Sequence, residues 1–129
     1  MDERYTLKKE ERLSSKDGLN ALLAASNYGR EKVLKYCYRT CNSLPYNRIV
    51  VTVPKRLFKR AVWRNLLKRR IREAYRLNKH ILRPAVRRDG DDKWGGTDIL
   101  FIYSTREVLD QDQVTAMVVS VLKKLAYHA

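Results

Sequence analysis

The spacing of apolar side chains changes several times along the chain, and each change predicts a different element. After the serine pair at 14–15, which can cap a helix, Leu19, Leu22 and Leu23 recur at helical spacing, and residues 27–29 can end this segment. A short helix is therefore expected near the N-terminus.

Three segments have the pattern of β-strands. Residues 30–40 alternate two sets of side chains, one of which includes Tyr36 and Tyr38, as the two faces of a strand require. Residues 48–54 are rich in β-branched side chains and stop at a proline, which cannot donate to a β-ladder. Residues 97–104 are strongly hydrophobic and predict a further strand.

The longest helix is predicted from Phe58 or Lys59 to about Leu82, because Pro84 disfavours helical backbone before it. One side of this helix gathers apolar residues, namely Val62, Trp63, Leu66, Leu67, Ala74, Leu77 and Ile81. The opposite side gathers polar and basic residues, namely Arg60, Arg64, Asn65, Lys68, Arg72, Arg76, Lys79 and Arg83. Arg70 falls on the apolar side, where we expect its charged end to reach solvent.

A capping box opens the last predicted helix, since Asp110 is followed three residues later by Gln113. Its apolar face carries Val114, Met117, Val118, Val121, Leu122 and Leu125. Helices and strands in this order predict an α+β fold, a small α/β sandwich in which helices cover a sheet. The whole chain, residues 1–129, is expected to form one domain.

Positive charge is concentrated in the long helix. The chain has 28 Lys and Arg against 14 Asp and Glu, a formal net charge of +14. From Lys55 to Arg88 there are fourteen basic residues and one acidic residue, Glu73, so this segment alone carries +13. A solvated helix face usually mixes signs, whereas this one repels itself unless a counter-anion binds. A nucleic acid is the expected partner, with arginines on phosphates and Asn65 able to reach bases or riboses.

Groups for protein-based catalysis are sparse. Neither His80 nor His128 belongs to a nucleophile–histidine–acid pattern. Cys37 and Cys41 are too few for a disulfide framework and lack histidine partners for a metal, so we interpret both as reduced thiols. Asp89–Asp92 could bind a divalent cation, but acids in a glycine-containing loop are usually a solvated turn. No apolar run suggests a membrane span or signal peptide, so a cytoplasmic location is expected.

The basic segment "KRAVWRNLLKRRIREAYRLNK", preceded by the strand "RIVVTVPK", resembles the protein subunit of bacterial ribonuclease P. That family has a helix of pattern A-V-x-R-N-R-x-K-R-x-x-R-E. The matching residues here are Ala61, Val62, Arg64, Asn65, Lys68, Arg69, Arg72 and Glu73. The family also opens with a K-x-x-R-L stretch like residues 9–13, so the resemblance extends over nearly the whole chain.

The resemblance implies a mixed sheet of about four strands with three helices and a left-handed β-α-β crossover, against the usual right-handed rule. It implies an accessory subunit of an endoribonuclease that removes the 5′ leader of precursor tRNA. Its expected partners are the ribonuclease P RNA and the leader. Catalysis is expected to reside in the RNA with its magnesium ions, and no cofactor is expected on the protein.

The resemblance also assigns residues to two sites. The RNA-binding set on the basic helix is Arg60, Arg64, Asn65, Lys68, Arg69, Arg72 and Arg76. The leader-cleft set is Leu19, Leu23, Tyr36, Tyr38 and Thr52. The two tyrosines have an alternative interpretation as core or sheet-edge residues with satisfied hydroxyls.

The chain departs from the family pattern in three places. Leu66 replaces the last arginine of R-N-R, Lys59 replaces a glycine of many relatives, and Leu19 and Leu23 replace phenylalanines. The change at Leu66 removes one expected phosphate or base contact, and the leucines are expected to replace stacking on the leader by apolar contact. A ribosomal or general RNA-binding protein is the alternative function. A DNA-binding regulator is disfavoured, because no dimerisation helix is evident.

Overall fold

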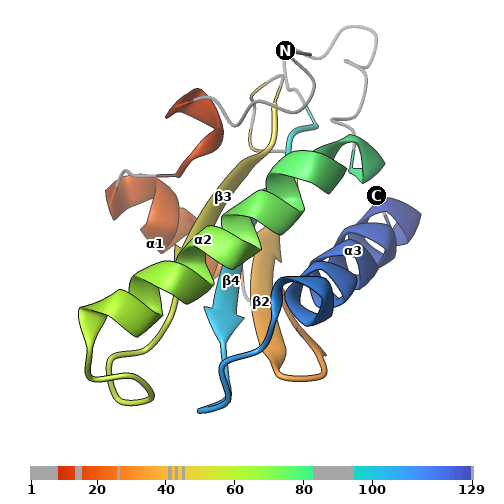
Figure 1. The fold of residues 1–129 in the computed structure, drawn as a ribbon. Helices are drawn as coiled ribbons and strands as arrows, with labels where there is room; N and C mark the ends of the chain where they lie inside the picture. The colour runs from red at the N-terminus through yellow and green to blue at the C-terminus, as the bar shows by residue number, and fades with distance from the viewer. Residues whose placement is uncertain are drawn as a thin grey trace, which may run out of the picture.

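The computed structural model describes residues 9–13, 16–25, 27–40, 42, 44, 46–82 and 95–128. The chain runs from a short helix through three successive strands to a long helix, a fourth strand and a last helix (Figure 1). The elements in order are the 3-10 turn η2 Lys9–Glu11, α1 Lys16–Ala24, β1 Asn27–Glu31, β2 Leu34–Arg39, β3 Arg48–Thr52, α2 Ala61–Asn78, the 3-10 turn η3 Lys79–Ile81, β4 Asp98–Tyr103 and α3 Gln111–His128. No helix in these ranges is both long and apolar enough to cross a membrane.

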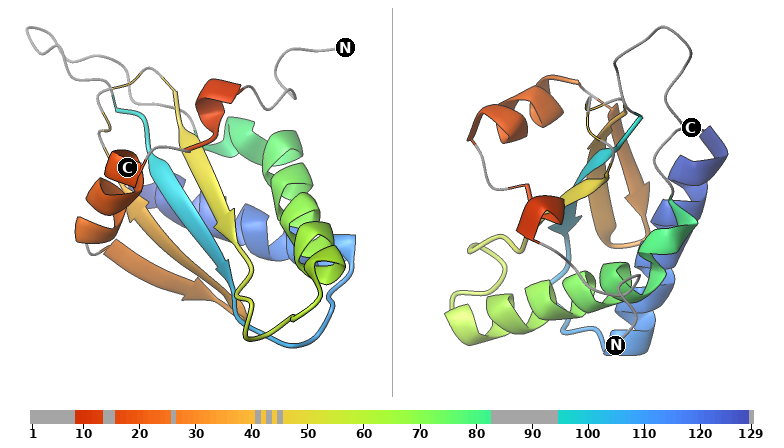
Figure 2. Two further views of the ribbon diagram at one scale, coloured as in Figure 1. Left: turned by 90° about the vertical axis from the view of Figure 1, so that its left-hand side faces the viewer. Right: turned by 90° about the horizontal axis from the view of Figure 1, so that it is seen from above.

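The strands form one mixed sheet in the order β1-β2-β4-β3. β2 pairs antiparallel with both β1 and β4, whereas β3 and β4 are parallel. The connection β3-α2-β4 is a left-handed crossover (Figure 1). α2 and α3 cover one face of the sheet and α1 lies on the other (Figure 2). The α/β sandwich and the crossover expected from the resemblance are confirmed.

β1 was not predicted as a separate strand, because residues 30–40 were expected to form one continuous strand, whereas the structure divides them between β1 and β2. Residues 27–29 were expected to end the first helix, but they pair with residues 36–38 of β2 across a tight turn. Lys32 makes that turn with a φ of 54°. The sequence of β1 is short, polar and glycine-containing, so it has little strand propensity of its own and depends on its partner.

α2 begins later than predicted, at Ala61, and continues after Asn78 only as the 3-10 turn η3. The backbone N–H of Phe58 donates to the Pro54 carbonyl in the preceding turn. The Phe58 ring is buried, with its centroid 5.9 Å from that of Tyr103. Tertiary packing thus holds Phe58 in a loop, outside the helix.

The buried face of α2 also differs from the prediction. Its buried residues are Leu67, Ile71, Ala74 and Tyr75. Val62, Trp63 and Leu77, which were expected to pack on the sheet, are exposed. The buried residues cover a narrower part of the helix surface than the predicted apolar side does, and they face a different direction. The reason is that α3 packs beside α2 on the same face of the sheet.

α3 matches its prediction closely. The Gln113 N–H donates to Asp110 Oδ1 at 2.8 Å, and the Asp110 N–H donates to Gln113 Oε1 at 3.1 Å, so both bonds of the capping box form. All six side chains predicted for its apolar face are buried. They join the main core between α2, α3 and the sheet.

Candidate nucleic-acid interface

Four basic side chains between residues 60 and 72 have no acidic partners among the residues that the structure describes. The residues of this group, including the one just before the helix, are Arg60, Lys68, Arg69 and Arg72. Elsewhere the described ion pairs are Arg48–Asp98, Arg39–Asp98, Arg76–Glu73, Lys79–Glu11 and Lys124–Glu31. The charge of these four side chains is thus left for an external anion.

Arg72 is an exposed residue of α2 with another cation close by. Partial burial of its guanidinium lowers the pKa, and the like charge of Arg12 in the N-terminal segment lowers it further. The chain holds these two arginines near each other with no described carboxylate to compensate. The negative charge of a bound phosphate would favour the charged guanidinium and so offset both effects on its pKa.

Three other arginines of α2 have structural partners. Arg64 donates to the carbonyls of Phe58 at 2.7 Å and Lys59 at 2.8 Å, so it fastens the loop to the helix start. Arg70 donates to the Leu109 carbonyl, which explains a charged residue on the side facing α3. Arg70 is half-buried, and this bond satisfies part of its guanidinium within the protein. Arg76 pairs with Glu73 at 2.5 Å, and Asn65 is exposed.

The sheet face on the α1 side is only partly covered. Strand register places Arg30, Lys35, Ile102 and Thr52 opposite one another in one row across all four strands. Arg30, Lys35 and Thr52 are exposed, and Ile102 is half-buried. The row combines two cations with an apolar centre, which suits an extended single strand of nucleic acid.

The next row on the same face is covered by α1. Leu22 of α1 is fully buried with Cys37 and Leu100, and the Cys37 thiol donates to the Leu22 carbonyl at 3.4 Å. Burial raises the pKa of this unpaired thiol. Leu19 packs against this cluster, while Leu23 is 40% exposed. α1 therefore forms a wall along the open row.

The two tyrosines assigned to the leader cleft lie on the opposite face. Tyr36 is 7% exposed and packs in the main core beneath α3. A Cβ on Gly29 would lie 2.3 Å from its ring, so the ring closely covers this glycine. The Tyr38 ring is half-buried, 6.2 Å from that of Tyr36. Their assignment to one cleft with Thr52 is wrong, and the core interpretation is correct.

Sequence reasoning did not single out Arg30 and Lys35 as site residues. Alternation in β2 separates Lys35 and Cys37 from the tyrosines, but it does not say which set faces the core. The signal that could have found the site is the exposed charge of Lys35, since charged side chains are rarely buried. Arg30 was hidden because β1 was not predicted as a separate strand.

The acids, thiols and histidines were the remaining candidates for metal or thiol chemistry. Within the described ranges no three His, Cys, Asp or Glu side chains gather as a metal site. The acidic run Asp89–Asp92, Cys41 and the His128 side chain lie outside the described residues. Asp98, fully buried, serves the fold, because it accepts from Arg48 at 2.7 and 2.8 Å and from Asn42 at 2.8 Å.

Comparison with known proteins identifies the relatives of this chain. The family model for Ribonuclease P matches residues 7–126. A ribonuclease P protein component of Porphyromonas gingivalis is 40% identical over 80 residues, 60% of this chain and 58% of that protein. One from Chlorobaculum tepidum is 44% identical over 59 residues, 46% of this chain and 38% of that protein. The chain thus aligns with less than two thirds of each relative's length.

Solved structures share the fold. The RNase P protein from Thermotoga maritima superposes with a TM-score of 0.69 at 24% identity, covering 88% of this chain and 96% of that one. The Staphylococcus aureus RNase P protein gives a TM-score of 0.71 at 19% identity, with 89% and 94% covered. At these identities the superpositions establish the architecture of the sheet and its three helices.

Proposed function

Because this chain belongs to the Ribonuclease P family, we propose that it is the protein subunit of ribonuclease P, assisting a catalytic RNA in the endonucleolytic removal of the 5′ leader from precursor tRNA. The observation that carries the proposal is the group of cations on α2 that have no acidic partner among the described residues. A protein that held these charges only for solubility would not concentrate them on one helix in such excess over acidic residues.

The first task is to bind the catalytic RNA through α2. Arg60, Lys68, Arg69 and Arg72 contact phosphates, and the counterions that they displace favour association. Arg64 and Arg76 contribute charge while keeping their bonds within the protein. Asn65, exposed among them, supplies a donor and an acceptor for a base or ribose.

The second task is to hold the leader on the open row of the sheet. Arg30 and Lys35 attract its phosphates, Ile102 offers an apolar contact for a base, and Thr52 offers a hydroxyl. Leu19 and Leu23 of α1 flank this row. Phosphate neutralisation by the protein lowers the magnesium concentration that the two RNAs need to associate, and the hydrolytic magnesium ions stay on the RNA.

The test is cleavage of precursor tRNA by a bacterial ribonuclease P RNA at low magnesium, with and without this protein. We expect the protein to restore correct 5′ cleavage, and an Arg60→Gln, Arg69→Gln variant to lose most of this effect. A Lys32→Gln, Lys123→Gln variant is the matched control, since it removes two exposed lysines from the β1–β2 turn and from α3. It is expected to behave as wild type.

A general RNA-binding protein remains the competing function, because it shares the cations of α2. Protein that binds the RNA but never promotes cleavage, even with its cognate RNA, would establish that function instead. Equal losses in the two double variants would show that net charge matters and its position on α2 does not.

A further inference from the structure

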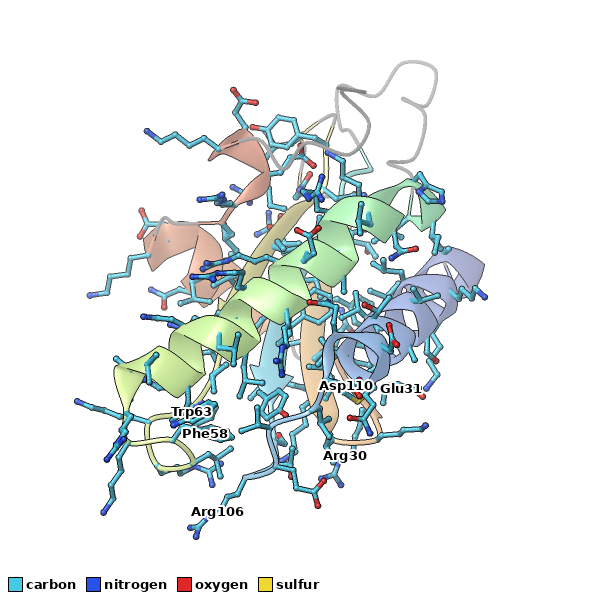
Figure 3. All side chains as sticks on the ribbon, viewed as in Figure 1. Arg30, Glu31, Phe58, Trp63, Arg106 and Asp110 are labelled. Atoms are coloured by element: carbon cyan, nitrogen blue, oxygen red, sulfur yellow. The ribbon has the colours of Figure 1, made fainter. Side chains whose placement is uncertain are left out.

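The outer face of α2 carries apolar side chains that the fold does not cover. Val62 is 66% exposed and Trp63 is 42% exposed, both in the first turn of the helix. Figure 3 shows Trp63 at this end of α2, close to the Phe58 loop. A hollow of about 290 Å³ opens there, lined by Val62, Trp63, Asn65, Leu66 and Arg69.

The positive charge around this hollow indicates what kind of ligand it would bind. From Lys55 to Arg72 the chain has nine Lys and Arg and no Asp or Glu. An ordinary apolar segment of a protein would gain nothing from this positive field. RNA fits both features, because its bases are flat and apolar on their faces while its phosphates are negative.

We propose that this hollow binds one unpaired nucleobase of RNA, stacked on the indole of Trp63. The inference rests on the proposed function, since the RNA is the one that α2 binds. Arg69, at the rim and without an acidic partner among the described residues, binds the adjacent phosphate. The exposed Asn65 amide bonds the edge of the base. A hollow slightly smaller than the usual drug-sized pocket of about 300–1,000 Å³ suits a single base.

Leu66 gains a role in this arrangement. It stands where the family pattern has the last arginine of R-N-R, and it lines the hollow as a half-buried apolar side chain. An arginine there would project charge into the space beside Trp63. The substitution thus exchanges a phosphate contact for a base contact.

The first test compares Trp63→Leu with Trp63→Phe in binding to ribonuclease P RNA at several salt concentrations. Leucine keeps an apolar contact but has no ring face, whereas phenylalanine still stacks. We expect Trp63→Leu to weaken binding roughly 5- to 100-fold and Trp63→Phe much less. The salt dependence should not change, because no charge is removed. Melting temperatures of the free variants check that both remain folded.

A second variant, Leu66→Arg, separates base stacking from phosphate binding. We expect this variant to steepen the slope of log binding constant against log salt concentration by about the amount of one phosphate contact. It should also weaken binding at high salt, where stacking dominates. Tighter binding than wild type at every salt concentration would overturn the proposal. So would a Trp63→Leu variant with wild-type affinity, which would leave the surface to a protein partner.

Fluorescence gives an independent readout. In a Trp94→Phe background the emission of Trp63 alone is followed, and we expect RNA to change it through stacking. Unchanged emission on saturation with RNA would overturn the proposal. Failure of the parent protein to bind the RNA or to promote cleavage would instead contradict the proposed function, so the two failures are distinguishable.

Discussion

The two faces of the sheet are built from neighbouring residues of the same strands, yet they do different things. On the face covered by α2 and α3, Tyr36, Phe101 and Val51 are buried in one row. On the α1 face, Lys35, Ile102 and Thr52, each next in sequence to one of these, form an accessible row. One face holds the molecule together, and the other is available to a ligand.

The difference comes from how much each face is covered. α2 and α3 have 18 residues each and lie side by side, whereas α1 has 9 and covers only one end of its face. A short helix therefore leaves part of a sheet open without exposing the main core. Residues that stabilise the core and residues that are available for binding therefore alternate along the same strands.

The largest expected effect tests this separation directly. Tyr36→Ala removes a buried ring and should lower the free energy of unfolding by about 3–5 kcal/mol, as for other large aromatic truncations. Lys35→Ala, one residue away, should change it by less than about 0.5 kcal/mol. Urea unfolding measures both. Similar losses at the two positions would contradict the separation of the faces.

A smaller effect is expected from the open row. An Arg30→Gln, Lys35→Gln variant should bind precursor tRNA more weakly, with the salt slope reduced by roughly 0.7 for each charge that contacted the single strand. Binding of mature tRNA and of the catalytic RNA alone should not change. Binding assays with the leader present and absent provide the measurement, and equal losses in both would remove the leader from this row.

The smallest expected effect is a dependence of stability on pH, and it comes from a buried tyrosine on the core face. Burial, with a further contribution from Glu11, raises the pKa of Tyr75 well above the ordinary value of 10.0. Its neutral form is thus favoured by the fold, so this stability is present below about pH 10 and is lost as rising pH ionises the tyrosine of the unfolded chain. Unfolding measured from pH 8 to 11 should show this loss, and Tyr75→Phe should reduce it.

Much of this organisation could be predicted from the sequence. The capping box and apolar face of α3, the alternation in β2 and the basic surface of α2 are local patterns, and the structure contains each of them. Local patterns do not show which face of a strand or helix points toward the core. Alternation separated Tyr36 from Lys35, but only the position of α3 determines that the tyrosine is buried.

The same limit explains the errors in α2. Ile71 and Tyr75 are buried because α2 packs at an angle set by α3 and the sheet, while the more N-terminal Val62 and Trp63 extend past that contact. The ends of the helix were misplaced for a related reason, since Phe58 is held by Tyr103 from a distant strand. The exposed tryptophan could not be recognised as a site residue until the packing was known.

The order of the strands has a consequence for how the chain folds as it is synthesised. β4 lies between β2 and β3, so Leu34 of β2 cannot pair with Tyr103, nor Val50 of β3 with Leu100, until β4 has been synthesised. The hairpin of β1 and β2 can form early, but every other pairing closes a long loop, which slows folding. Until β4 leaves the ribosome, the nascent chain therefore exposes two hydrophobic strand edges together with a complete basic helix.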